Sequence, residues 1–257
     1  MLFQPVKEHA PIRDKLGDTV EDFYFESFDQ TRLHGWYLPL RVNANTPQHT
    51  VLFLHGNAIN ISSHIGGVYW MPDYGIEAFI FDYRGFGKSE GIADLAPILT
   101  DIGAAIEYVN KKKKSHSKLV IVGHSIGASM GLAVASQARF KDMIGAFVSI
   151  SAFSDYRVVT REMLSRHWLT WLFQWPLSLT ISNEYRPLDY VSYISPVPLF
   201  FMHGKHDDII KSHHTQSLYE AALEPKQLFW LESNHNDVFS IQTNRQKIID
   251  YLSTLAR

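Results

Sequence analysis

Gly123-His124-Ser125-Ile126-Gly127 stands between an apolar run typical of a buried strand, 119–122, and a run of small and apolar residues typical of a helix, 128–135. A Gly-x-Ser-x-Gly pentapeptide in this setting indicates a nucleophile elbow, a strained turn that exposes one hydroxyl. Glycine is expected at both ends because a larger side chain would collide with the neighbouring strand and helix. Ser125 is therefore the candidate nucleophile, and an ordinary glycine-serine turn is the alternative.

A serine hydroxyl is a weak nucleophile, so this elbow requires an acid and a base further along the chain. Two later strand-like runs end in polar turns, one carrying Asp207 and Asp208 and the other carrying His235. The carboxyl ends of parallel strands meet at one edge of an open sheet. We expect His235 to act as the general base for Ser125, and Asp207 to orient the imidazole and stabilise its protonated form. Asp208 is the alternative acid, and a solvated turn carboxylate is the alternative role for either aspartate.

The turn His55-Gly56-Asn57 follows another apolar strand-like run, 51–54. Acyl transfer builds negative charge on the former carbonyl oxygen, and two fixed backbone N–H groups stabilise that charge. We predict that Ile126 and Asn57 supply these two N–H groups. A simple turn before a helix is the alternative.

The rest of the chain alternates between strand-like and helix-like runs after a short amino-terminal lead and a hairpin. The hairpin is predicted at 19–27 and 33–40, and core strands at 51–54, 78–82, 119–122, 145–150, 199–202 and 227–231. Helices are predicted at 96–112, 126–139, 213–222 and 245–256. This alternation predicts the α/β class, with a mostly parallel sheet covered by helices on both faces.

Taken in order, these motifs resemble those of the α/β-hydrolase superfamily. The matching stretches are Leu54 to Ala58, Phe81 to Gly91, Gly123 to Gly127, Gly204 to Asp207 and Asn234 to Asp237. The combination is most similar to the branch of serine hydrolases that includes protein depalmitoylases and bacterial esterase-like proteins, over about residues 23–239. The resemblance implies an α/β-hydrolase fold and favours Asp207 as the acid, because the family's acid usually follows the strand-end glycine after two residues.

Two stretches near these motifs need separate comment. Ile59-Asn60-Ile61 departs from the family, whose members often carry a Gly-Asn pair, which affects the expected shape of the oxyanion loop. Arg84, within the Phe81 to Gly91 stretch, is expected to brace neighbouring backbone rather than to contact substrate.

Residues 153–195 are too long for an ordinary connection between strands. By resemblance, an insertion at this place is the cap that covers the nucleophile. It contains Trp168, Trp171 and Trp175 among leucines and a phenylalanine. Such a cap predicts an apolar acyl chain as substrate or a patch that contacts a membrane. The alternative is that these side chains only pack the cap onto the body of the protein.

Composition limits the remaining function classes. The chain has 257 residues, of which 46% are hydrophobic, which predicts one domain spanning 1–257 with a sizeable core. The net charge of −2 gives no global basic field for nucleic acid, and the absence of cysteine excludes disulfides and a thiolate nucleophile. The amino-terminal residues read neither as a signal peptide nor as a membrane span, so we expect a soluble, cytoplasmic protein.

Two further patterns look chemical but have simpler explanations. His203, His206, His213 and His214 could bind a metal, but no Cys or Glu completes a familiar ligand spacing, so no metal is expected. The lysine run 111–114 is explained by solvation and by the negative end of a helix.

The sequence thus predicts a serine hydrolase that cleaves a carboxylic ester or thioester through an acyl-enzyme on Ser125, without a cofactor. Thioesters are included by resemblance alone. One alternative is an amidase or peptidase on the same triad, and another is a non-catalytic hydrolase fold that acts as a receptor or scaffold. Dehalogenase and epoxide hydrolase activities are disfavoured, because they need a carboxylate where this chain has Ser125.

Overall fold

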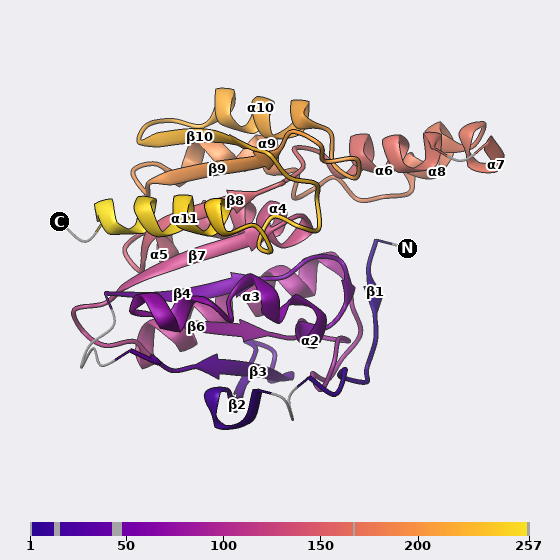
Figure 1. The fold of residues 1–257 in the computed structure, drawn as a ribbon. Coiled ribbons are helices and arrows are strands. Elements are labelled where there is room, and N and C mark those ends of the chain that lie inside the picture. The colour runs from indigo at the N-terminus through magenta and orange to yellow at the C-terminus, as the bar shows by residue number, and fades with distance from the viewer. Residues whose placement is uncertain (1, 13–15, 43–47, 167, 256–257) are drawn as a thin grey trace.

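A computed structural model describes residues 2–12, 16–42, 48–166 and 168–255. Its centre is an eight-stranded sheet in the order β10-β9-β8-β7-β4-β6-β3-β2 (Figure 1). The strands are β2 (Glu21–Glu26), β3 (Arg32–Leu38), β4 (His49–Leu54), β6 (Ile76–Phe81), β7 (Lys118–His124), β8 (Ile144–Ile150), β9 (Leu199–Gly204) and β10 (Lys226–Leu231). Only β3 pairs antiparallel with both of its neighbours, so the predicted hairpin and mostly parallel sheet are confirmed.

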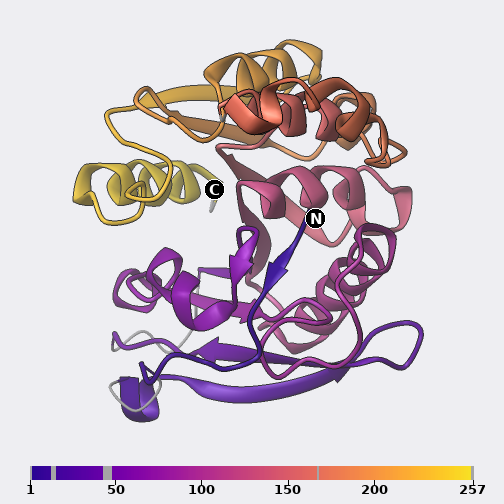
Figure 2. The same cartoon turned by 90° about the vertical axis from the view of Figure 1, so that its right-hand side faces the viewer.

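The central strands are mostly apolar because both faces of the sheet are covered. Along β7, Leu119 and Ile121 join the core cluster on one face, whereas Val120 and Val122 join the cluster on the other. The first cluster takes side chains from α3 (Leu95–Lys112), α4 (Ile126–Ala135), α5 (Ala138–Lys141) and α10 (Ser212–Ala221). The second takes them from α2 (Ile61–His64), the 3-10 turns η2 (Ile65–Gly67) and η3 (Met71–Tyr74), and α11 (Gln242–Leu255). Figure 2 shows the two layers on opposite sides of the sheet.

The predicted helices occur close to their expected places, with one interruption. The run expected at 126–139 divides into α4 and α5, because the backbone at Gln137 is extended. Lys111 and Lys112 form the last turn of α3, where cations interact favourably with the helix end. The last residue of the predicted final helix, Ala256, lies outside the described residues.

The amino-terminal lead is more ordered in the structure than the sequence indicated. A two-residue strand, β1 (Gln4–Pro5), pairs parallel with β5 (Ala58–Ile59) to form a second, small sheet. Figure 2 shows β1 running beside β5 and past the near end of α4. The first residues of the chain therefore lie next to the predicted oxyanion loop.

Within residues 153–195, helices α6 (Tyr156–Ser165), α7 (Trp168–Trp171) and α8 (Gln174–Leu179) project beyond the sheet (Figure 1). The short helix α9 (Pro187–Tyr190) and the turn η4 (Val191–Ile194) then lead into β9. Trp168 is 78% exposed, Leu172 71% and Trp175 62%. The alternative that these side chains only pack the insertion onto the body is therefore wrong. None of the helices in the described part of the chain has the length and apolarity needed to cross a bilayer.

Arg84 has a structural role in the loop after β6, although its partners differ from the expected ones. Its guanidinium Nε donates to Asp101 Oδ2 at 2.8 Å, and Nη1 donates to Asp29 Oδ2 at 2.8 Å. The arginine braces side chains from α3 and from the hairpin turn, and not the neighbouring backbone. A bidentate guanidinium-carboxylate pair of this kind fixes a loop in one orientation.

Candidate active site

Ser125 lies at the turn between β7 and α4 in a strained conformation. Its φ is 55° and its ψ is −125°, in a region that non-glycine residues rarely occupy. The Ser125 N–H donates to Ile150 O at 2.9 Å, and its carbonyl accepts from Ser129 N at 3.1 Å. These bonds to β8 and to the next turn of α4 hold the backbone in place, so the turn has the features of a nucleophile elbow.

Gly127 explains why the elbow needs glycine after the nucleophile. A Cβ at this position would lie 2.3 Å from Leu54 O and 2.4 Å from His55 O. The first turn of α4 is thus packed directly on the backbone at the end of β4. Any larger residue at position 127 would push the elbow away from the His55–Asn57 turn.

The structure brings Asp207 and His235 together at the carboxyl ends of β9 and β10. Asp207 Oδ2 lies 2.7 Å from His235 Nδ1, and Oδ1 accepts from the N–H groups of Ile209 and Ile210 at 2.9 and 2.8 Å. The Asp207 side chain is fully buried, whereas Asp208 is exposed. Burial alone would raise the pKa of Asp207, but the hydrogen bond and charge of His235 lower it, so the carboxyl is ionised at neutral pH.

His124 connects the elbow to the loop that carries His235. Its Nε2 donates to His235 O at 3.0 Å, and the two rings lie 4.8 Å apart. Burial lowers the pKa of His124 well below its ordinary value, so its ring is neutral. Within the described residues, the Ser125 hydroxyl forms no hydrogen bond to the His235 ring. Catalytic contacts of this type are often long in ligand-free enzymes and shorten in the substrate complex.

Ser125, Ile126 and Asn57 line one cavity of about 310 Å³. Ile126 is the first residue of α4, so its N–H has no acceptor within the helix and lies at the positive end of the helix dipole. Helix α6 contributes four of the nine other lining residues, and most of the wall is apolar. The other lining residues are Leu2, Gln4, Phe153, Val159, Thr160, Met163, Leu164, Ile181 and Ile210.

The amino-terminal segment is a part of this site that the sequence did not reveal. Leu2 and Gln4 line the cavity, and Gln4 N donates to Asn57 O at 3.4 Å. Two residues on, Val6 N donates to Ile59 O at 2.9 Å. Ile59 has φ of 67°, so the departure from the family's glycine leaves an isoleucine in a left-handed conformation that the segment holds in place. No periodicity in residues 2–10 indicated this role.

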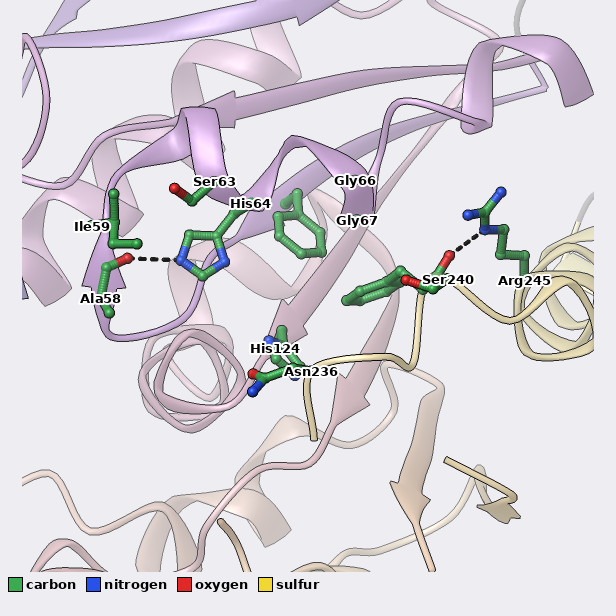
Figure 3. A pocket seen from close by; sticks show the side chains of 12 residues that line it. Ala58, Ile59, Ser63, His64, Gly66, Gly67, His124, Asn236, Ser240 and Arg245 are labelled. Carbon is green, nitrogen blue, oxygen red and sulfur yellow. Dashed lines mark hydrogen bonds between the residues drawn. The ribbon is translucent and has the colours of Figure 1, made fainter. Parts of the chain in front are cut away.

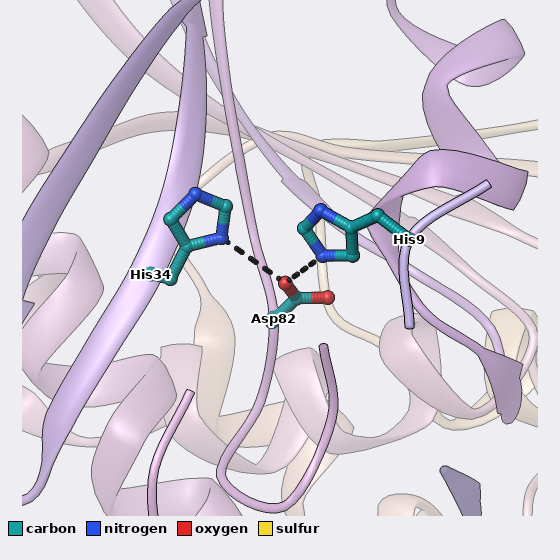
Figure 4. Close-up of side chains that lie close together, drawn as sticks. All are labelled: His9, His34 and Asp82. Atoms are coloured by element: carbon teal, nitrogen blue, oxygen red, sulfur yellow. Dashed lines mark hydrogen bonds and ion pairs between the residues drawn. The ribbon is translucent and has the colours of Figure 1, made fainter. Parts of the chain in front are cut away.

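Asp82, at the end of β6, ties the amino-terminal segment to the sheet (Figure 4). Its Oδ2 accepts from His9 Nε2 at 2.8 Å and from His34 Nδ1 at 3.2 Å, and its Oδ1 accepts from Ile61 N at 3.0 Å. Burial opposes ionisation of Asp82, but the hydrogen bonds from His34 and His9 bring its pKa well below its usual range. One buried carboxylate therefore fixes three segments around the oxyanion loop.

Ser151 is a second residue that sequence reasoning missed. It follows β8 with φ of 49°, and its N–H donates to Met202 O at 2.9 Å. Its side chain also helps to lower the pKa of Asp207, although its buried hydroxyl forms no hydrogen bond of ordinary geometry with the described residues. The Ser-Ala-Phe-Ser stretch after β8 has no motif that would single it out.

In the part of the chain that the structure describes, two clusters have the donor atoms to hold a metal ion. One is His9, His34 and Asp82, and the other is Glu162, His213 and His214. No ligand spacing in the sequence indicated the glutamate of the second cluster, because Glu162 of α6 lies fifty-one residues from His213 along the chain although it approaches His213 Nε2 to 2.7 Å. Lys211 Nζ also lies 3.4 Å from Glu162 Oε1, so a cation already neutralises this carboxylate. Of the other candidates, His203 bonds Thr215 and the Ile210 carbonyl, and His206 lies near Glu232.

Residues 45–192 match the family model described as serine aminopeptidase, S33. Among curated proteins, the uncharacterized protein YfhR of Escherichia coli O157:H7 is 34% identical over 225 residues, which cover 86% of this chain and 75% of that protein. The alpha/beta hydrolase domain-containing protein WAV2 of Arabidopsis thaliana is 25% identical over 79% of this chain and 66% of its own length. The sequence similarity thus extends beyond the elbow to most of the chain.

Solved structures show the same fold at low sequence identity. The Pyrococcus furiosus esterase Pf2001 superposes with a TM-score of 0.75 at 19% identity, covering 99% of this chain and 97% of that one. Est1E of Butyrivibrio proteoclasticus, solved with ferulic acid bound, superposes with a TM-score of 0.66 at 17% identity, covering 90% of this chain and 96% of that one. The predicted α/β-hydrolase fold is thereby confirmed.

Replacing Asp82 should change how the free energy of unfolding depends on pH. Because the pKa of Asp82 is lower in the folded chain than in the unfolded one, its stabilisation is present above about pH 4 and is lost as the pH falls toward the folded pKa. We expect Asp82→Asn to reduce the free energy of unfolding by about 3 kcal/mol at pH 7, with a smaller difference at pH 3. Urea unfolding of both proteins from pH 3 to 7 measures this, and a difference independent of pH would contradict it.

Proposed function

Because this chain belongs to the serine aminopeptidase S33 family of α/β-hydrolases, we propose that it is a serine hydrolase that cleaves a carboxylic ester or thioester through an acyl-enzyme on Ser125. The observation that carries this proposal is the 2.7 Å contact of His235 Nδ1 with the buried carboxylate of Asp207, beside a strained elbow. A buried acid on one ring nitrogen leaves Nε2 of the imidazole as the acceptor that a serine nucleophile requires.

In the first step, Ser125 Oγ attacks the carbonyl carbon of the substrate while His235 Nε2 accepts the hydroxyl proton. The resulting imidazolium is stabilised by Asp207. The bond from carbon to the leaving oxygen or sulfur then breaks, and His235 gives its proton to the leaving group. Water repeats the sequence on the acyl-enzyme, which releases the carboxylic acid and restores the Ser125 hydroxyl.

The negative charge of each tetrahedral intermediate is assigned to the N–H groups of Ile126 and Asn57. Support for this assignment comes from the cavity that both residues share with Ser125, and from the position of Ile126 at the amino-terminal end of α4. Donors fixed before the reaction stabilise developing charge without reorganisation, and each is worth about 10²- to 10³-fold in rate.

The cavity beside Ser125 suits an apolar acyl chain. Val159, Leu164 and Met163 of α6 face Phe153 and Ile210 across a volume of about 310 Å³. Among the residues that line this cavity, none is charged. We assign the acyl part of the substrate to this side, and residues 153–195 act as the cap that forms its outer wall.

Fluorophosphonate labelling separates a serine hydrolase from a non-catalytic member of the fold. We expect one probe per chain on Ser125, and no labelling of Ser125→Ala, because the activated hydroxyl is the only group that the probe should modify. His235→Ala should react at a rate reduced by about 10⁴-fold or more, because the hydroxyl then loses its base. Intact-mass spectrometry measures both. Ser136→Ala, at the carboxyl end of α4, is the matched control and should react like the wild type; labelling of Ser125→Ala at the wild-type rate would contradict the assignment.

The length of the acyl chain tests the apolar cavity. Each buried CH₂ contributes about 0.8 kcal/mol, so kcat/KM for p-nitrophenyl esters should rise about fourfold per carbon until the cavity is filled. Leu164→Ala should shift the optimum to longer chains, because it enlarges the cavity wall. Initial rates over a series from acetate to laurate give the profile, and a sharp acetate optimum would contradict an acyl site here.

We also propose that the exposed face of α7 and α8 contacts the surface of a lipid bilayer. Tryptophans favour the membrane interface because their rings are apolar and their N–H groups are polar. Arg161 lies 4.3 Å from the Trp175 ring, which adds positive charge beside the apolar side chains. Arg161 belongs to α6, and other residues of α6 line the acyl cavity. A substrate chain could therefore pass along α6 from the bilayer to Ser125.

Flotation with vesicles of phosphatidylcholine and phosphatidylglycerol measures this contact. We expect the wild type to float with the vesicles, and the double variant Leu172→Ser/Trp175→Ser to remain at the bottom of the gradient. Ile92→Ser is the matched control, because Ile92 is 84% exposed but lies far along the chain from α7 and α8. Equal flotation of all three proteins, or of none, would exclude a specific role for this face.

A further inference from the structure

A second cavity, of about 420 Å³, lies beside the predicted active site and has no role in the mechanism above (Figure 3). It is bounded by η2, by β5 and by the loop that follows His235. Its lining residues are Phe53, Ala58, Ile59, Ser63, His64, Gly66, Gly67, His124, Asn236, Phe239, Ser240 and Arg245. None of them lines the cavity of Ser125, but Ala58 and His124 are chain neighbours of Asn57 and Ser125, which line that cavity.

The lining of this cavity carries positive charge. Among the described residues that line it, Arg245, in the first turn of α11, is the only one with a permanent charge, and none is a carboxylate. Its Nε donates to the Phe239 carbonyl, which leaves the two terminal nitrogens of the guanidinium. Among the described residues, no carboxylate forms an ion pair with Arg245. A half-buried guanidinium without a carboxylate partner is suited to an anionic ligand.

His64 lies at the opposite end of the cavity from Arg245 in Figure 3. Its Nε2 donates to Ala58 O at 2.9 Å, which fixes the tautomer. Burial lowers the pKa of His64, so the ring is neutral and Nδ1 remains an acceptor. The positive charge is therefore confined to the Arg245 end.

The position of the cavity relates it to one half of the substrate. It contains His124 and Asn236, the chain neighbours of Ser125 and His235. In the proposed mechanism His235 protonates the leaving group, so this group must lie on the side of the loop that carries His235. The acyl chain is assigned to the other cavity, with Ile126 and Asn57.

We propose that this second cavity binds the leaving-group half of the substrate, and that Arg245 recognises an anionic group, such as a carboxylate, on the alcohol or thiol that is released. This inference rests on the proposed function for its reaction step. Phe53 and Phe239 supply apolar walls for the body of that group, and Arg245 provides the charged end.

The test compares two acetate esters that differ in the charge of the leaving group, 4-acetoxybenzoate and its methyl ester. The measured quantity is the kcat/KM for the charged ester, 4-acetoxybenzoate, divided by the kcat/KM for its neutral methyl ester. Differences in general activity between variants cancel in this ratio. We expect Arg245→Gln to lower this ratio about tenfold, as the loss of one charge-assisted hydrogen bond predicts. Arg245→Lys, which keeps the charge, should recover part of the loss.

Lys247→Gln is the matched control, because it removes the same charge from the same helix at a position outside the cavity. Its ratio should stay within about twofold of the wild type. An unchanged ratio in Arg245→Gln, or an equal fall in Lys247→Gln, would overturn the assignment of Arg245.

A binding measurement tests the cavity without turnover. Titration calorimetry of Ser125→Ala with 4-hydroxybenzoate should detect binding that is lost when Arg245→Gln is added. Gly66→Leu should also weaken it, because a Cβ at Gly66 meets no atom within 4 Å and a larger side chain would fill the cavity. If the wild type fails to react with a fluorophosphonate, the proposed function fails, and this titration alone supports or overturns the anion site.

Discussion

The contact on which the site depends is the packing of the first turn of α4 on the backbone at the end of β4. The space at Gly127 is so small that a Cβ would lie 2.3 Å from Leu54 O. This approach holds Ser125 at a positive φ and brings its neighbour Ile126 close to the turn that carries Asn57. The strain of the elbow is maintained because β4 and β7 pair along their whole length behind it. The proposed nucleophile and the proposed oxyanion loop are thus positioned by one backbone contact, which explains why the site can be rigid although its residues are far apart in sequence.

A similar approach of two backbones holds the proposed acid, Asp207, and the proposed base, His235. A Cβ at Gly204 would lie 2.4 Å from Ser233 O, so the turn after β9 and the turn after β10 pack without any side chain between them. His206 N donates to the same Ser233 carbonyl at 3.1 Å. Asp207 and His235 emerge from these two turns and meet at 2.7 Å. In both halves of the site, a glycine allows two strand ends to approach closely. The polar side chains that follow these strands are therefore close enough to contact one another.

The sequence predicted the fold and the centre of the site because both are encoded locally. Apolar runs at 119–122 and 199–202 gave their strands within two residues at either end, since buried parallel strands are apolar on both faces. Strand ends predicted that an aspartate of the 207–208 pair meets His235, and the family resemblance favoured Asp207. The long-range contacts were not accessible in this way. β1 has two residues and no pattern, and the approach of Glu162 to His213 joins a cap helix to a helix of the body. Nothing in the spacing of these residues indicates that the chain brings them together.

This division has a functional meaning. The proposed reacting groups come from strand ends of the sheet, whereas much of the lining of the two cavities comes from the amino-terminal segment, from α2 and η2, from the insertion 153–195 and from the loop before α11. Leu2 and Gln4 line the Ser125 cavity, and their segment is held there by the pairing of β1 with β5 and by the bond of His9 to Asp82, seventy-three residues away. Changes in these peripheral segments can alter the shape and charge of a cavity without moving the elbow, since they do not take part in the β4–α4 contact. Under the proposed function, selection of the substrate and catalysis are therefore carried by different parts of the chain, and a relative with the same elbow need not share the same substrate.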